Sequence, residues 1–231
     1  MSLKPFSFNT HNDLRGTHAI FSPSQSSFLR YDDEKVIDKI VNQYRAALGS
    51  EIHEFASREI PLNHRVTNAR NLQNQIESYI YNKYYSEEHN VVTPYGEKLL
   101  NYLGYMPREV YDTLKFYIND AVGFKMTVEQ PLVYPGFEDY IRGTTDAICF
   151  RNKLLRIHDL KTGSHKADVE QLEVYAALFC LEYNIKPADI SYELRLYQID
   201  GIEIFNPTVE DILPAVDAII GIGRVIKESI I

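Results

Sequence analysis

The chain has 231 residues, 45% of them hydrophobic, so it is long enough to form one large domain with a sizeable core. No apolar run approaches the roughly 20 residues that a membrane helix needs, and no apolar signal core follows the first residues. We therefore expect a cytoplasmic protein. The net charge of −8 argues against tight, sequence-independent binding of duplex nucleic acid by a monomer, because basic patches normally supply phosphate affinity.

The N-terminal half is predicted to be mainly helical, over residues 24–123. Residues 1–22 are polar and show no periodicity, which is typical of a partly disordered leader. A first short helix is expected to take Ser22 or Ser24 as its N-cap. Apolar side chains then recur at helical spacing over residues 34–59, and further helices are expected up to residue 123.

His53 lies at the edge of the apolar stripe of the long predicted helix, about 100° around the axis from Ile52. The small residues Ala46 and Gly49 lie on the same side and would let a neighbouring segment approach closely. Taken alone, this position favours a histidine satisfied at the edge of a core over a metal ligand.

Residues 125–133 are predicted to form a strand that contains Glu129. Two interpretations of this side chain stay open at this point, a solvated glutamate and one that reaches a site on the sheet. Two apolar runs further on, residues 147–150 and 154–157, flank the polar Arg151-Asn152-Lys153, which predicts two strands joined by a tight hairpin.

Side chains alternate along a strand, so Asp159 and Lys161 share one face and His158 faces away as a structural residue. A two-residue loop would place Asp146 directly opposite Asp159 or Ile157, depending on which two residues turn. In both cases the Asp146 side chain points the same way as Asp159, so two carboxylates and an ammonium converge.

The C-terminal part predicts a helix, a hairpin and a final helix. Asp168 is expected to cap a helix that runs to about Asn184, and residues 191–199 form a strand that returns through an Asp200-Gly201 turn. Residues 208–231 are predicted to be the closing helix. The fold class is therefore α/β, with a mixed central sheet flanked by helices and a helical N-terminal half.

The convergence of carboxylates has a cost that a cation would remove. Two carboxylates about 4 Å apart repel by roughly 4 kcal/mol at an effective dielectric near 20. Oxygen ligands with open positions suit Mg²⁺ or Mn²⁺. The alternative is an idle ion pair on an exposed strand, because Asp159-Leu160-Lys161 is a common tripeptide.

Four motifs in order resemble the RecB-like branch of the PD-(D/E)xK nuclease superfamily, including phage-encoded exonucleases and CRISPR-associated nucleases. That pattern has a histidine on a helix, a Gly-x-x-Asp strand, an Asp/Glu-x-Lys strand and a Gln-x-x-x-Tyr helix. The chain offers Gly49-Ser-Glu-Ile-His53, Gly143-Thr-Thr-Asp146, Asp159-Leu160-Lys161 and Gln171-Leu-Glu-Val-Tyr175. The resemblance covers residues 45–200, and Thr145 stands where other branches have proline.

The resemblance implies one restriction-endonuclease-like domain over residues 1–231, with the catalytic sheet and helix in residues 125–206. It implies a site with three kinds of residue. The catalytic residues are Asp146, Asp159 and Lys161; the ligands of Mg²⁺ or Mn²⁺ are His53, Asp146, Asp159 and the Leu160 carbonyl; Gln171 and Tyr175 contact the substrate or position Lys161. Glu129 could join the metal or position Lys161. Ser22 and Ser24 could touch DNA, although capping is the simpler role.

The implied function is a metal-dependent exonuclease that hydrolyses phosphodiester bonds of linear DNA in phage or bacterial recombination, replication or repair. DNA is the implied partner, together with a recombination or replication protein, in the host cytoplasm if a phage encodes the chain. Two alternatives stay open, a catalytically inactive DNA-binding or regulatory module and a structure-specific endonuclease.

Some relatives in the resembled family carry an iron–sulfur cluster held by four cysteines. Cys149 and Cys180 cannot build such a cluster within this chain, and we expect two buried thiols.

Overall fold

The computed structural model describes residues 19–163 and 168–230, and the chain divides into two compact units, Met1–Tyr44 and Arg45–Ile231. In the first unit, a 3₁₀ helix, η2 (Pro23–Arg30), precedes the start of α1 (Asp33–Glu59). Ser22 is its N-cap as predicted, but the Ser22 hydroxyl bonds to the Ser24 hydroxyl at 2.9 Å and caps no backbone N–H. Most of the predicted leader lies outside the described residues.

The helical half continues in the second unit, where α1 ends and three more helices follow. Their bounds, with those of a small hairpin between them, are α2 (Ala69–Tyr84), β1 (Tyr85–Ser86), β2 (Val91–Val92), α3 (Pro94–Gly104) and α4 (Arg108–Phe124). The Asn68 side chain accepts from the Asn71 N–H at the start of α2, and Thr93 caps α3 in the same way, ahead of Pro94. Lys125, in the left-handed conformation, ends α4.

The second half of this unit is a mixed five-stranded sheet with two helices. The elements are β3 (Thr127–Val133), β4 (Arg142–Arg151), β5 (Leu154–Leu160), α5 (Glu170–Glu182), η3 (Pro187–Asp189), β6 (Ser191–Gln198), β7 (Gly201–Phe205) and α6 (Val209–Ile230). The strand order is β3-β4-β5-β6-β7, and all neighbours are antiparallel except β5 and β6. The predicted α/β class with a helical N-terminal half is confirmed.

Two hairpins fix the registers of the sheet. Asn152 and Lys153 turn between β4 and β5 with φ of 51° and 62°, which is the type I′ geometry that matches strand twist. The β6–β7 hairpin turns one residue earlier than predicted, because Gln198 pairs with Gly201 and Ile199-Asp200 form the loop. The positive φ that glycine tolerates, 141°, falls on Gly201, just after the turn.

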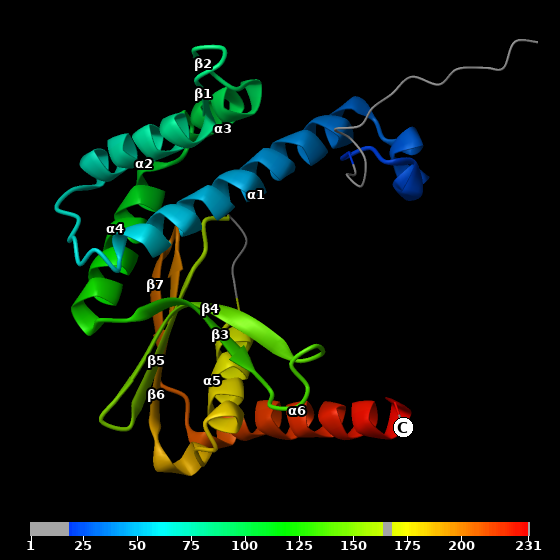
Figure 1. The fold of residues 1–231 in the computed structure, drawn as a ribbon, viewed down its shortest axis with the longest axis vertical. Coiled ribbons are helices and arrows are strands. Elements are labelled where there is room, and N and C mark those ends of the chain that lie inside the picture. The colour runs from blue at the N-terminus through cyan, green and yellow to red at the C-terminus, as the bar shows by residue number, and fades with distance from the viewer. Residues whose placement is uncertain (1–18, 164–167, 231) are drawn as a thin grey trace, which may run out of the picture. The chain divides into compact units, whose positions relative to one another are not determined.

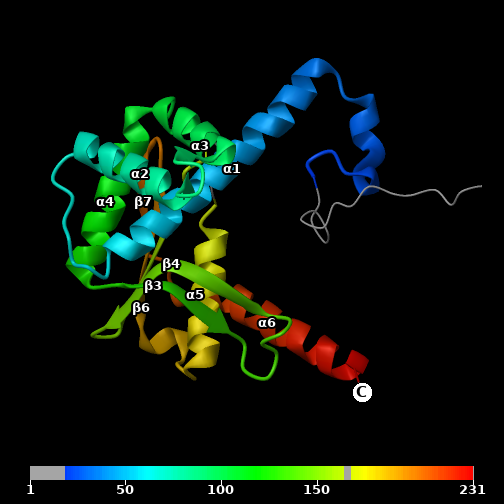
Figure 2. The ribbon, with the colours of Figure 1, turned by 45° about the horizontal axis from the view of Figure 1, so that its top comes forward.

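Helices cover both faces of the sheet (Figure 1). The two faces differ in polarity. On one face, α5 packs on the central strands and α6 packs against α5, as Figure 2 also shows. A large apolar cluster lies there and includes Leu155, Ile157, Leu172, Ala176, Leu194, Leu196, Ile212 and Val216. On the other face α4 meets polar and charged groups of β5 and β6, chiefly His158, Arg195 and Tyr197.

Three further predictions from the sequence concern the two cysteines, the start of α5 and the length of the apolar helices. Cys149 and Cys180 are buried free thiols, as expected. The predicted cap of α5 is displaced by one residue, because Val169 is the N-cap and Asp168 precedes it, although the Asp168 carboxylate still accepts from the Glu170 N–H at 3.2 Å. Within the described ranges, no helix is long and apolar enough to cross a bilayer.

His158 is fully buried beneath α4, on the face of the sheet away from Asp159, as predicted. The Tyr197 hydroxyl donates to Asp120 Oδ2 at 2.7 Å and lies 3.2 Å from His158 Nδ1. Since the Tyr197 proton goes to Asp120, His158 Nδ1 is assigned as the donor of the second bond. Nε2 then carries no proton and is buried against Phe124 without a hydrogen bond among the described residues. Burial, followed by the charges of Arg195 and Arg156, lowers the pKa of His158 to about 3.

This lowered pKa predicts a loss of stability in mild acid. The unfolded chain binds a proton at His158 near pH 6.5 and the folded chain only near pH 3, so the free energy of unfolding falls as the pH drops through that window. The slope from this group approaches about 1.4 kcal/mol per pH unit. Urea titrations at pH 7, 6 and 5 in EDTA should show a shallower decline for His158→Gln, whose amide keeps a partner for Tyr197. Equal slopes in the two proteins would contradict the buried neutral histidine.

Candidate metal centre

Three carboxylates lie in one row across β3, β4 and β5. In the β4–β5 ladder Ala147 pairs with His158, so the next position outward sets Asp146 opposite Asp159. The turn at Asn152-Lys153 decides between the two pairings that the sequence left open. In the β3–β4 ladder the pairs on either side leave Glu129 opposite Asp146. The registers of the β3–β4 and β4–β5 pairs therefore place three acidic residues at neighbouring positions of the sheet.

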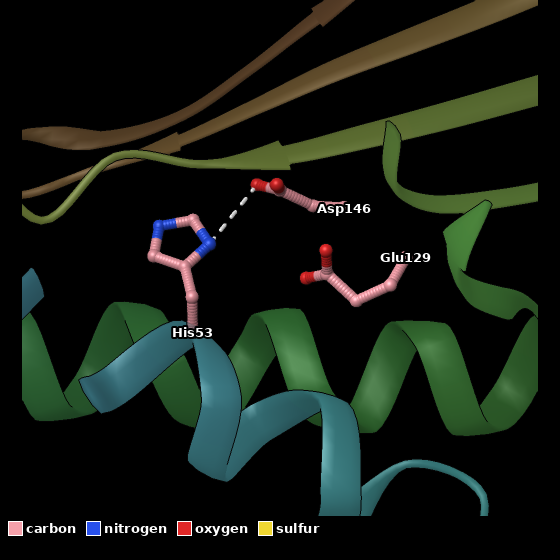
Figure 3. A group of neighbouring side chains, drawn as sticks. All are labelled: His53, Glu129 and Asp146. Carbon is pink, nitrogen blue, oxygen red and sulfur yellow. Dashed lines mark ion pairs between the residues drawn. The ribbon is translucent and has the colours of Figure 1, made fainter. Parts of the chain in front are cut away.

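His53 from α1 completes a cluster with two of these acids (Figure 3). One ligand atom from each of His53, Glu129 and Asp146 lies within 4.8 Å of the others. His53 Nδ1 is 3.5 Å from Asp146 Oδ2, and the two side chains are partly exposed. α1 and the neighbouring strands β3 and β4 thus direct one nitrogen and two carboxylates toward a common point.

Gly49, one turn before His53, allows α1 to reach this position. A Cβ added at Gly49 would lie 2.7 Å from Thr162 Oγ1, just beyond the end of β5. Gly49 is one of the small residues that the sequence places on the His53 side of the helix, and its close neighbour is Thr162. A larger side chain would require Thr162 or α1 to move, so the small residue permits the close approach of the helix that carries His53.

Glu129 adopts a backbone conformation that is costly for a residue with a side chain. Its φ is 50°, in the left-handed region, and it forms no ladder pair although both neighbours do. Such strain persists only where the surrounding structure imposes it, and it concentrates at functional sites. Here the distortion occurs at the residue that meets His53 and Asp146.

Asp159 is 4% exposed and is paired with Lys161 on the same strand end. Lys161 Nζ donates to Oδ1 at 3.1 Å and lies 2.9 Å from Oδ2. Oδ2 is buried and, among the described residues, accepts no well-directed hydrogen bond, despite the short distance to the ammonium. A buried carboxylate oxygen with unused acceptor capacity is what a bound cation would satisfy.

A chain of side-chain hydrogen bonds connects Lys161 to α5 and back to β4. Lys161 Nζ donates to Gln171 Oε1 at 3.0 Å, Gln171 Nε2 donates to the Tyr175 hydroxyl at 3.3 Å, and that hydroxyl donates to the Thr144 carbonyl at 2.7 Å. Gly143 is required beneath the tyrosine, because a Cβ there would lie 2.7 Å from Tyr175 Cε1. The Gly-x-x-Asp and Gln-x-x-x-Tyr motifs are therefore in contact with each other.

Leu160 contributes through its backbone N–H, which donates to Asp146 Oδ2 at 2.7 Å. This bond ties the Asp146 carboxylate to the end of β5 and orients it toward His53. The expected role of the Leu160 carbonyl as a metal ligand stays a prediction.

The electrostatics show the cost of gathering these acids without a cation. Burial and then the charge of Asp146 raise the pKa of Asp159, against the opposing effect of Lys161. Burial and the charge of Asp146 likewise raise the pKa of Glu129. Burial would lower the pKa of His53, but the hydrogen bond with Asp146 and the surrounding negative charges outweigh it and raise the pKa. Acids with raised pKa values destabilise the metal-free fold as the pH rises and they ionise.

The donor set fits a divalent cation. His53, Glu129 and Asp146 offer imidazole nitrogen and carboxylate oxygen, and Asp159 adds a buried oxygen that accepts no well-directed hydrogen bond among the described residues. Carboxylates suit Mg²⁺ and Mn²⁺ alike, whereas an imidazole ligand is more favourable to the transition metals. The presence of His53 therefore favours Mn²⁺ over Mg²⁺.

Of the predicted site residues, the structure brings His53 to Asp146, Asp159 to Asp146, and Gln171 and Tyr175 to Lys161. Glu129 was left between two interpretations, and the structure places it in the His53–Asp146 cluster. The pairing of β3 with β4 would have revealed it, because it lies opposite Asp146. Sequence periodicity alone does not give that pairing.

Binding of Mn²⁺ is expected to stabilise the fold by relieving the carboxylate repulsion. At a metal concentration of about 100 times Kd the gain is roughly 2.7 kcal/mol, which corresponds to a rise in Tm of about 5–10 °C for a chain of this size. Differential scanning fluorimetry should show that Glu129→Gln reduces the shift and that His53→Ala reduces the Mn²⁺ shift more than the Mg²⁺ shift. Glu87→Gln, at an exposed position of the β1–β2 turn, is the matched control. Equal shifts in all variants would refute this metal site.

Comparisons with known proteins place the chain in a family but supply no activity. No curated protein and no solved structure matches it significantly. Residues 33–207 match the family described as "Protein of unknown function (DUF2800)", and this range runs from the start of α1 through β7 and contains every residue of the metal centre. The chain therefore belongs to the DUF2800 family.

Proposed function

We propose that the chain is a divalent-metal-dependent deoxyribonuclease that resembles the RecB-like branch of the PD-(D/E)xK superfamily. The observation that carries the proposal is the placement of Lys161 between Asp159 and Gln171, beside the His53–Glu129–Asp146 cluster. The four sequence motifs meet at one end of a mixed sheet in the order that this branch uses. A set of residues that served packing alone would not combine paired carboxylates with an ammonium held from two sides.

Each side chain has a distinct expected role in phosphodiester hydrolysis. His53, Glu129, Asp146 and Asp159 would hold the cation, which when bound supplies positive charge at the scissile phosphate and lowers the pKa of water. Lys161 orients the attacking water and donates hydrogen bonds to the oxygens that gain negative charge in the transition state. The water oxygen bonds to phosphorus as the bond to the leaving oxygen breaks, without a covalent enzyme intermediate.

Gln171 and Tyr175 support this chemistry by fixing the ammonium. Gln171 accepts from Lys161, and Tyr175 anchors Gln171 to β4 through the Thr144 carbonyl. This arrangement favours positioning of Lys161 as the primary role of Gln171. Its amide lies on the exposed side of α5, so contact with the substrate backbone is compatible with that role.

The substrate is proposed to be a DNA end in the cytoplasm of a bacterium or of a phage-infected host. A net charge of −8 gives little generic affinity for the interior of a duplex, so productive binding should require an end held at the metal centre. An exonuclease of recombination, replication or repair fits this requirement. A recombination or replication protein would be its natural partner.

The test of this function is cleavage of end-labelled linear DNA by the purified chain with Mn²⁺ or Mg²⁺. Cleavage should be abolished by EDTA and restored by Mn²⁺ at least as well as by Mg²⁺, because the paired carboxylates need a cation. Covalently closed circles should be spared. Linearisation of circles would instead indicate an endonuclease, and DNA binding without cleavage under all metal conditions would indicate an inactive binding module. Full activity in EDTA would rule out the proposed mechanism.

Substitutions at Asp159 and Lys161 should separate metal binding from turnover. Asp159→Ala removes a cation ligand, so calorimetry should show weaker Mn²⁺ binding together with loss of cleavage. Lys161→Ala should keep Mn²⁺ binding within a few-fold while turnover falls by about 100-fold or more, since its role lies in the transition state. Lys186→Ala removes an exposed lysine and should leave both unchanged. A folded Lys161→Ala chain that binds no Mn²⁺ would disprove this division of roles.

A further inference from the structure

A buried carboxylate fixes the turn of α1 that carries His53. Glu51, 7% exposed, accepts from Lys83 Nζ at 2.7 Å and from the Tyr84 hydroxyl at 2.6 Å. Both donors come from the last turn of α2. A buried carboxylate is tolerated only where its charge is paired, so these two bonds hold α1 against α2 at one defined point.

Glu51 and His53 lie on opposite sides of α1. Two residues correspond to about 200° around a helix axis, and Ile52 between them is fully buried. On the His53 side Gly49 abuts Thr162, so α1 is confined between α2 and the segment after β5. Rotation or sliding of α1 would have to break the Glu51 bonds, and it would carry the imidazole away from Asp146.

The two donors to Glu51 hold their protons strongly. Burial alone would lower the pKa of Lys83, but its hydrogen bonds with Glu51 and Glu54 raise the pKa well above its usual value. Burial and the bond with Glu51 raise the pKa of Tyr84 too. Both donors therefore hold their protons more strongly than the same side chains do in free solution.

We propose that Glu51 is a positioning residue, which through Lys83 and Tyr84 holds α1 at the rotation and height that bring His53 to Asp146 and Glu129. The inference rests on the proposed metal-dependent function and adds a residue to it that does not itself touch the cation. Glu54 provides a matched comparison, since it accepts from the same Lys83 at 2.6 Å but is 48% exposed and lies one residue beyond His53.

The experiment is a double-mutant cycle on Mn²⁺ affinity with the full chain. Calorimetry compares Glu51→Ala, Glu51→Gln and Glu54→Ala in the wild-type and His53→Ala backgrounds, at a temperature well below each Tm and with circular dichroism as the check of folding. Glu51→Ala should weaken Mn²⁺ binding about tenfold, and Glu51→Gln should recover most of the affinity because its amide oxygen can accept from Tyr84. Glu54→Ala should bind as the wild type does.

Coupling to His53 separates positioning from simple stabilisation. In the His53→Ala background, Glu51→Ala should change the affinity less than about twofold, because the residue it positions is already gone. Equal losses in both backgrounds, or unchanged affinity in Glu51→Ala, would overturn the proposal.

A readout without metal keeps this proposal distinct from the proposed function. In metal-free protein, the NMR resonances of the His53 imidazole should shift in Glu51→Ala and stay in place in Glu54→Ala. A wild-type chain that binds no Mn²⁺ would refute the metal-dependent function, and the imidazole resonances would still decide whether Glu51 positions His53. Unshifted resonances in a folded Glu51→Ala chain would overturn the positioning role.

Discussion

Repulsion among carboxylates on neighbouring strands is the constraint that the rest of the site accommodates. Two unit charges about 5 Å apart repel by roughly 3 kcal/mol at an effective dielectric of 20, and the chain places three acids in one row. Lys161 compensates Asp159 in part, and His53 lies beside Asp146. The pKa values of Asp159 and Glu129 are raised nevertheless, so the local cations do not balance the row. A divalent cation would complete the neutralisation.

Packed layers support the sheet that carries this row on both of its faces. Beneath α5 the sheet is apolar and close-packed, while beneath α4 it holds the Asp120–Arg195–Tyr197–His158 network. The guanidinium groups of Arg156 and Arg195 both lie over the Phe124 ring. A site that must hold like charges together benefits from such support, because the strands cannot relax apart without loss of both layers.

The strained backbone of Glu129 and the buried carboxylate of Glu51 both lie close to the metal centre along the chain or in space. The left-handed backbone of Glu129 costs free energy, and the buried charge of Glu51 is tolerated because Lys83 and Tyr84 pair with it. Both concern residues whose displacement would change the geometry at His53 and Asp146. Residues that lower the stability of the fold locally are common at sites where side chains must meet a ligand at fixed distances.

The sequence by itself determined the elements that depend on local interactions. Alternation placed Asp159 and Lys161 on one side of a strand, and the polar Arg151-Asn152-Lys153 between two apolar runs predicted the hairpin. The structure then showed which two residues turn and that Asp146 lies opposite Asp159. Helical spacing placed Gln171 and Tyr175 on one face of α5. The Asp200-Gly201 signal predicted the second hairpin but placed its turn one residue too late, because Ile199 and Asp200 form the loop.

Only the tertiary structure decided the contacts between segments that are far apart in the chain. The meeting of Glu129 with Asp146 depends on the pairing of β3 with β4 and on a positive φ that no residue preference of glutamate predicts. In the sequence Glu51 is an ordinary acidic residue of a helix. Its partners Lys83 and Tyr84 become known only from the packing of α2 against α1. Periodicity along the sequence shows which side of an element is buried, but it does not show which element covers that side. The identity of each partner is settled by packing across the whole chain.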